Sequence, residues 1–143
     1  MTGEARIGTL AIVVTRGTSN SLFQAATLVR AATAIEWAVR VLFRDGAALK
    51  LTRERVNTDE WASIYTPVLD QLGARLKAAD FVDMESFLRD AKEHGDDVRF
   101  WASEETFSAY GLSAADLIPC IDGTMGEVEF AHIADTGDVS LTF

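Results

Sequence analysis

Ser103 stands where a buried strand would run directly into a helix. Residues 98–112, VRFWASEETFSAYGL, begin with apolar strand formers and continue with Glu104 and Glu105 at the start of a helical stretch. In α/β proteins, side chains at such junctions often contact ligands or take part in chemistry. Ser103 therefore has three candidate roles: nucleophile, ligand contact, or N-terminal cap of the helix.

A nucleophilic serine needs a general base within hydrogen-bond reach and a third group to orient that base. The two histidines of the chain, His94 and His132, lie in no recognisable motif, and no G-x-S-x-G turn is present. A capping serine, by contrast, needs only a free backbone amide two or three residues on, and contributes about 1 kcal/mol. The sequence favours the cap and leaves the other two roles open.

Cys120 is the single cysteine and therefore the one thiol that could carry sulfur. It lies seventeen residues after Ser103, at the start of a predicted short strand, where a cysteine is most often a small buried apolar residue. One cysteine excludes an internal disulfide. Two isolated histidines without a cysteine pair do not form a zinc site, and DGTMGE lacks the spacing of a calcium loop. We predict no metal and no cofactor.

The polar turn RGTSN, residues 16–20, follows the first apolar run of the chain. In a doubly wound sheet, ligands bind beyond the carboxyl ends of the strands. We therefore expect a crevice between the first strand and the strand that ends at Ser103. The candidate ligand-binding residues are Arg16, Thr18, Ser19, Ser103 and Glu104, with a small anion as the ligand. RGTSN is not a phosphate loop, because it lacks the glycine and lysine pattern.

Hydrophobic periodicity predicts an α/β chain. We predict strands at residues 9–15, 39–43, 98–102, 120–122 and 139–143, the last at a sheet edge. We predict helices at residues 21–38, 61–78 with a kink at Pro67, 83–95 and 124–135, and an exposed connection at residues 44–60. The short returns from helix to strand favour parallel pairing with right-handed crossovers.

The 143 residues suit a single domain, residues 1–143, and their 48% hydrophobic content is that of an ordinary globular core. The formal net charge of -9 argues against nucleic acid or anionic lipid as a partner. No apolar run reaches the roughly 18 residues that span a bilayer, and MTGEARIGTLAIVV lacks the charge layout of a signal peptide. We therefore expect a cytoplasmic protein that binds neither membranes nor nucleic acid.

The C-terminal third carries a family resemblance. FWAS, Gly111-Leu112, Asp116-Leu117-Ile118, Gly126 and GDVSLTF follow one another in the order seen in the DsrE/DsrF-like family, small proteins of sulfur relay that include the TusBCD subunits. The resemblance implies a three-layer α/β/α sandwich whose five-stranded parallel sheet has the order 2-1-3-4-5. It also places the sulfur-carrying cysteine of the family at Ser103. A hydroxyl cannot replace that thiol, because an alcohol neither ionises near neutral pH nor holds a persulfide.

These observations give a function and two alternatives. We expect a non-catalytic DsrE/DsrF-like protein, more a binding protein than an enzyme, that binds a partner of sulfur relay or a small ligand. The alternatives are a sulfurtransferase or sulfur carrier that uses Cys120, and a small enzyme that uses the Ser103 pocket. The resemblance and the apolar residues of the kinked helix both favour a homo-oligomer, a dimer, trimer or hexamer. The helix residues that favour it are Trp61, Ile64, Val68, Leu72 and Leu76, together with Tyr65 and Phe81.

Overall fold

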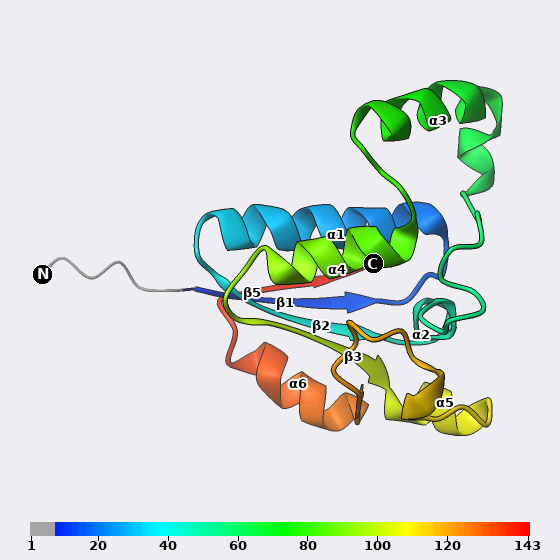
Figure 1. Ribbon diagram of the computed structural model, residues 1–143. Helices are drawn as coiled ribbons and strands as arrows, with labels where there is room; N and C mark the ends of the chain where they lie inside the picture. Colours follow the sequence, from blue (N-terminus) through cyan, green and yellow to red (C-terminus); the bar gives the residue numbers. More distant parts are fainter. Residues whose placement is uncertain (1–7) are drawn as a thin grey trace, which may run out of the picture.

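A five-stranded parallel sheet forms the centre of the computed structural model, which describes residues 8–143 (Figure 1). The α/β class and the five parallel strands predicted from the sequence are confirmed. The strands, in chain order, are β1 (Thr9–Val14), β2 (Ala38–Phe43), β3 (Val98–Ser103), β4 (Thr124–Met125) and β5 (Val139–Thr142).

The strand order is β4-β3-β2-β1-β5, so the predicted order 2-1-3-4-5 is wrong. From β1 the chain moves outward one strand at a time to β4 and then returns to pair β5 with the free edge of β1. The three central strands are similarly apolar, and apolarity alone does not specify which strands are neighbours. The fourth strand was also misplaced, because residues 120–122 form a turn beside β3 and the strand begins at Thr124.

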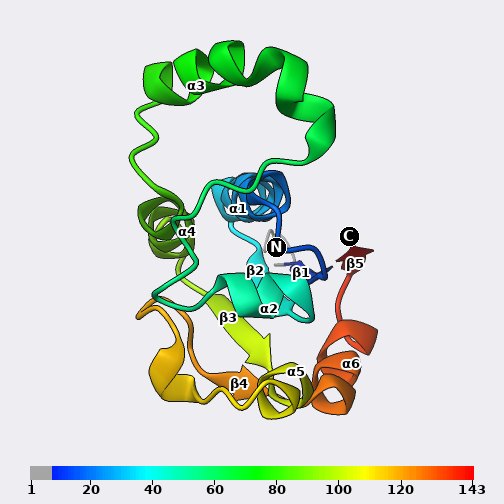
Figure 2. The same cartoon turned by 90° about the vertical axis from the view of Figure 1, so that its right-hand side faces the viewer.

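Helices lie on both faces of the sheet (Figures 1 and 2). α1 (Ser19–Ala34) and α4 (Met84–Glu93) cover one face, and α6 (Glu127–Asp135) packs on the other. Right-handed connections explain this division. The connections that run from β1 toward β3 place their helices on one face, and a connection that runs back across the sheet places its helix on the other. The return from β4 to β5 is the one that carries α6. The short helix α5 (Glu104–Ala109) follows β3 at the carboxyl edge.

Alternate residues of the strands enter two separate apolar clusters. Leu10, Ile12 and Val14 of β1 belong to the large core under α1 and α4, whereas Ala11 belongs to a small cluster with Leu42, Met125 and Phe130. β1 is thus buried on both faces, and its successive side chains point alternately into the two clusters. Because the second cluster is small, α6 covers less of its face than α1 and α4 cover of theirs.

The predicted exposed connection at residues 44–60 instead begins with a buried helix, α2 (Gly46–Lys50). Its Ala47, Ala48 and Lys50 are buried. The helix start packs backbone to backbone on the turn after β1: a Cβ at Gly17 would lie 2.3 Å from the Gly46 carbonyl oxygen. A glycine at position 17 is therefore required for this close approach.

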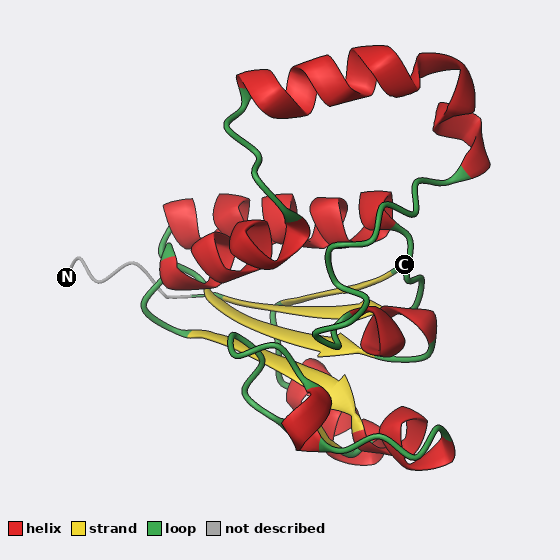
Figure 3. Cartoon of the chain, turned by 45° about the vertical axis from the view of Figure 1, so that its right-hand side comes forward, coloured by secondary structure: helices red, strands yellow, loops and turns green. Residues whose placement is uncertain are grey.

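Residues 61–82, which we call the arm, leave the body of the molecule and return to it (Figures 1 and 3). Instead of the single kinked helix predicted, the arm contains a 3-10 helix, η1 (Ser63–Val68), with Pro67 inside it, and then α3 (Leu69–Ala78). Neither element contains a buried residue. Core packing thus does not account for the apolar residues of η1 and α3.

Aromatic side chains attach both ends of the arm to the body. Phe23 of α1 stacks on Phe87 of α4 with ring centroids 4.7 Å apart. Trp61, at the start of the arm, lies 6.5 Å from Phe23, and Phe81, at its end, lies 5.3 Å from Phe87. Trp61 therefore belongs to the root of the arm, and its replacement would disturb the attachment of the arm to the body.

An ion pair holds the chain just before the arm. The side chain of Lys50 is 2% exposed, and its Nζ lies 3.0 Å from Oε1 of Glu60, whose side chain is 52% exposed. The same ammonium donates to the carbonyl oxygen of Thr58. A buried ammonium needs such partners, because removing a charge from water without compensation costs several kcal/mol.

We predict that Glu60→Gln lowers the free energy of unfolding by about 1–2 kcal/mol, since it leaves the buried Lys50 ammonium with a neutral partner. Urea denaturation measures the change. Glu54→Gln, a neutralisation of an exposed acid in the same connection, is the matched control and should change stability by less than about 0.5 kcal/mol. Equal effects of the two substitutions would contradict the assigned role of the pair.

Candidate functional site

Ser103 is the last residue of β3 and the N-cap of α5, and it is fully buried. Its Oγ accepts a hydrogen bond from the backbone N–H of Thr106 at 3.1 Å and donates one to Oε2 of Glu127 at 2.8 Å. The hydroxyl thus acts as both donor and acceptor within the protein. Ser103 has the capping geometry expected of a serine at a helix start.

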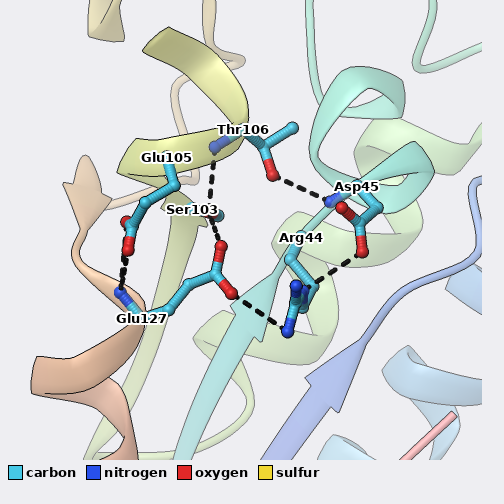
Figure 4. Close-up of polar contacts among 6 residues, drawn as sticks. All are labelled: Arg44, Asp45, Ser103, Glu105, Thr106 and Glu127. Carbon is cyan, nitrogen blue, oxygen red and sulfur yellow. Dashed lines mark hydrogen bonds and ion pairs between the residues drawn. The ribbon is translucent and has the colours of Figure 1, made fainter. Parts of the chain in front are cut away.

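Glu127 links the ends of three elements (Figure 4). It is the first residue of α6, and its Oε1 lies 3.0 Å from an Nη of Arg44, directly after β2. Arg44 also pairs through Nε with Asp45 at 3.1 Å. One carboxylate therefore connects the carboxyl end of β2, the carboxyl end of β3 and the start of α6.

The backbone at Asp45 has a positive φ of 51°, a conformation that non-glycine residues rarely adopt. Its N–H donates to Oγ1 of the buried Thr106 at 3.0 Å. This bond ties the turn after β2 to the first turn of α5. Local backbone strain of this kind persists where surrounding contacts enforce it, and it is concentrated at functional sites.

Glu105 completes the connections by capping α6. Both of its carboxylate oxygens accept from the backbone N–H of Glu127, at 3.0 and 3.2 Å. The residue before α6 is Gly126, which has no side chain to serve as a cap. An acidic side chain from α5 therefore supplies the acceptor that the start of α6 requires.

This arrangement does not equip Ser103 for nucleophilic catalysis. The hydroxyl is inaccessible to a substrate, and its carboxylate partner is already paired with Arg44. The histidines are elsewhere: Nδ1 of His94 lies 2.7 Å from Oγ1 of Thr33, and His132 is exposed on α6. Between residues 8 and 143, no group of three His, Cys, Asp or Glu side chains is placed to hold a metal ion.

The predicted anion site does not assemble, because β2 lies between β1 and β3. Thr18 bonds to Ser21 through their hydroxyls, at 2.9 Å. The Ser19 hydroxyl accepts from the backbone N–H of Glu60, also at 2.9 Å. Arg16 and Glu104 are exposed. The turn after β1 therefore holds the chain that leads to the arm, and of the predicted residues Ser103 alone joins the network around Glu127.

Cys120 lies in a turn near the start of β3, among Lys92, Val98 and Pro119. β3 runs from Val98 to Ser103, a length of about 16 Å at roughly 3.3 Å per residue. Cys120 and Ser103 therefore lie at opposite ends of this strand. Burial, partly offset by the charge of Lys92, raises the pKa of the Cys120 thiol to about 11. Cys120 is therefore a protonated thiol at neutral pH, remote from the site.

A groove of about 550 Å³ runs beside the network, between α6 and the uncovered part of the sheet. Its volume falls within the range of small-ligand sites. The apolar side chains that line it include Val13, Leu42 and Phe130, and Arg44 and Glu127 stand at one end. The guanidinium of Arg44 and the carboxylate of Glu127 are 40% and 24% exposed as side chains, so both are accessible to a ligand in the groove.

Sequence reasoning missed Arg44, Asp45 and Glu127. Arg44 and Asp45 directly follow an apolar strand, and Glu127 comes two residues after β4. The carboxyl ends of parallel strands meet at one edge of a sheet, which is a signal that could have brought these residues together. For Glu127 that signal was lost because the fourth strand was assigned to residues 120–122.

Comparison with known proteins establishes the fold and no more. The chain is similar to a protein of unknown function, MTH1491 from Methanobacterium thermoautotrophicum, with a TM-score of 0.56 and 15% sequence identity. The match covers 94% of this chain and 96% of that one. Neither a protein-family model nor a curated protein sequence matches the chain. No helix of residues 8–143 has the length and apolar character needed to cross a membrane.

We predict that Ser103→Ala lowers the free energy of unfolding by about 1–2 kcal/mol. The substitution removes the cap of α5 and leaves the partly buried Glu127 carboxylate without one donor. Chemical denaturation of the purified variant measures the loss. Ser108→Ala, at an exposed position of the same helix, is the control and should be nearly neutral. A Ser103→Ala protein as stable as the wild type would contradict the structural role.

Proposed function

We propose that this protein is a non-catalytic member of the DsrE/DsrF-like type, with that type's three-layer sandwich, and that it acts in sulfur metabolism or relay by binding a small ligand or a partner. The observation that carries the proposal is the state of Ser103. The residue at the family cysteine position is a buried hydroxyl with both hydrogen-bonding roles used inside the protein. A hydroxyl held in this way stabilises the carboxyl edge of the sheet and is not available as a nucleophile.

The groove beside Glu127 is the best supported place for a small ligand. Its lining combines apolar side chains from β1, β2 and α6 with an ion pair at one end, the composition typical of small-molecule sites. Arg44 has donors for an anionic or carbonyl group of the ligand, and the apolar lining suits its body. The proposal includes a cytoplasmic location and a homo-oligomeric state, as the sequence suggested.

A sulfur carrier that uses Cys120 is the main competing function, and its chemistry is directly testable. A carrier thiol must ionise to attack a sulfur donor. With a pKa of about 11 in place of 9.0, the thiolate fraction at pH 7 is about a hundredfold below that of an ordinary cysteine. Competence as a carrier would require Cys120 to leave its buried position.

We predict that the folded protein gains no sulfur when it is incubated with a persulfide donor at pH 7, as read by intact mass. The same chain unfolded in urea is the positive control, because its exposed thiol ionises normally and should accept sulfur. Loading of the folded wild type that disappears in Cys120→Ser would contradict the proposal in favour of the carrier. Loading should increase as the pH rises toward the pKa of about 11.

We predict that the groove binds the fluorescent probe anilinonaphthalene sulfonate, which has an apolar body and one anionic group. Ala131→Trp fills the groove from α6 and should reduce the bound fluorescence at least severalfold. Val128→Trp, at an exposed position of α6 outside the groove lining, is the matched control and should keep it. Equal binding by both variants would place the probe elsewhere and remove the support for a ligand site in the groove.

A further inference from the structure

The arm exposes apolar side chains that the fold does not use. Ile64 is 80% exposed and Val82 is 82% exposed, and Val68 and Leu69 are each more than two-fifths exposed. Leu69, Leu72 and Leu76 recur at helical spacing along α3 and remain exposed or half-buried. Such a surface on an otherwise well-packed protein marks an interaction site.

The charge distribution favours a second copy of the chain as the occupant of this surface. The arm contains two acids, Asp70 and Asp80, and two bases, Arg75 and Lys77. The net charge of -9 therefore lies entirely outside the arm. Two copies repel one another over the rest of their surfaces, and the neutral arm is where they approach at least electrostatic cost.

The charges on α3 are also complementary to themselves. Asp70 lies in the first turn and Lys77 in the last, seven residues apart and thus on one side of the helix. Between them is Gly73, where an added Cβ would meet nothing within 4 Å. No side-chain ion pair or hydrogen bond engages Asp70 or Lys77 within the described residues 8–143.

We infer that two copies associate through α3, packed antiparallel about a two-fold axis at Gly73 and Ala74. In this register, Asp70 of one copy faces Lys77 of the partner subunit, and the reciprocal pair forms by symmetry. Gly73 lets the helices approach closely, while Leu69 and Leu76 flank the crossing. This inference specifies the contact behind the homo-oligomeric state of the proposed function and rests on that part of it, whereas the proposed ligand binding in the groove is tested separately.

Charge reversal tests the register without altering the core. Sedimentation velocity of the full-length wild type at micromolar concentration should show a dimer. Asp70→Lys and Lys77→Asp each place like charges opposite one another, so each variant should dimerise about tenfold more weakly. An equimolar mixture of the two variants should recover wild-type association, because every pair across the axis is again complementary. This recovery is not expected if either substitution merely disturbs α3.

Two further variants delimit the interface. Gln71 lies two residues before Gly73 and therefore on the opposite side of the helix. Gln71→Lys adds charge to α3 at that side and should leave the dimer intact. Leu69→Glu should give a monomer. A monomeric wild type would overturn the inference, and the arm would then be a surface for a different protein. A dimer unaffected by Asp70→Lys, Lys77→Asp and Leu69→Glu would overturn it too, by placing the contact away from α3.

Discussion

A parallel sheet must be covered on both faces, and in this protein the two faces are covered unequally. α1 and α4 bury one face beneath two helices, whereas α6, a helix of 9 residues, packs on the other. The larger core is therefore on the α1 side, and the α6 side combines a small apolar cluster with a groove. The groove exists because this face is covered incompletely.

The polar network depends on the strand order more than on any single residue. Since β2 and β3 are neighbours and β4 is next to β3, the residues that follow these strands meet at one edge. Glu127 can then bind the Ser103 hydroxyl and the Arg44 guanidinium at once. In the order 2-1-3-4-5, β2 and β3 would not be neighbours, and Arg44 would lie on the far side of β1.

The sequence predicts what local patterns encode. The apolar runs at residues 9–15, 39–43 and 98–102 mark the central strands closely, and the junction at Ser103 is placed correctly. Local patterns do not reveal β4, because two residues are too few to form a pattern. They also do not reveal the burial of Lys50, which depends on contacts with Glu60 and Thr58 from outside its helix. Glu127 was missed for the same reason, since its role depends on contacts with distant residues. The amphipathic character of residues 69–78 was visible, but whether that face enters the core depends on the path of the arm.

The arm and α6, which lines the groove, lie on opposite sides of the sheet (Figures 1 and 2). Association through α3 therefore leaves the groove of each copy open to solvent. The proposed ligand binding and the inferred self-association would thus rest on different residues, on opposite sides of the sheet. A dimer of this form would present two identical binding faces, which is a geometry suited to bridging two partners.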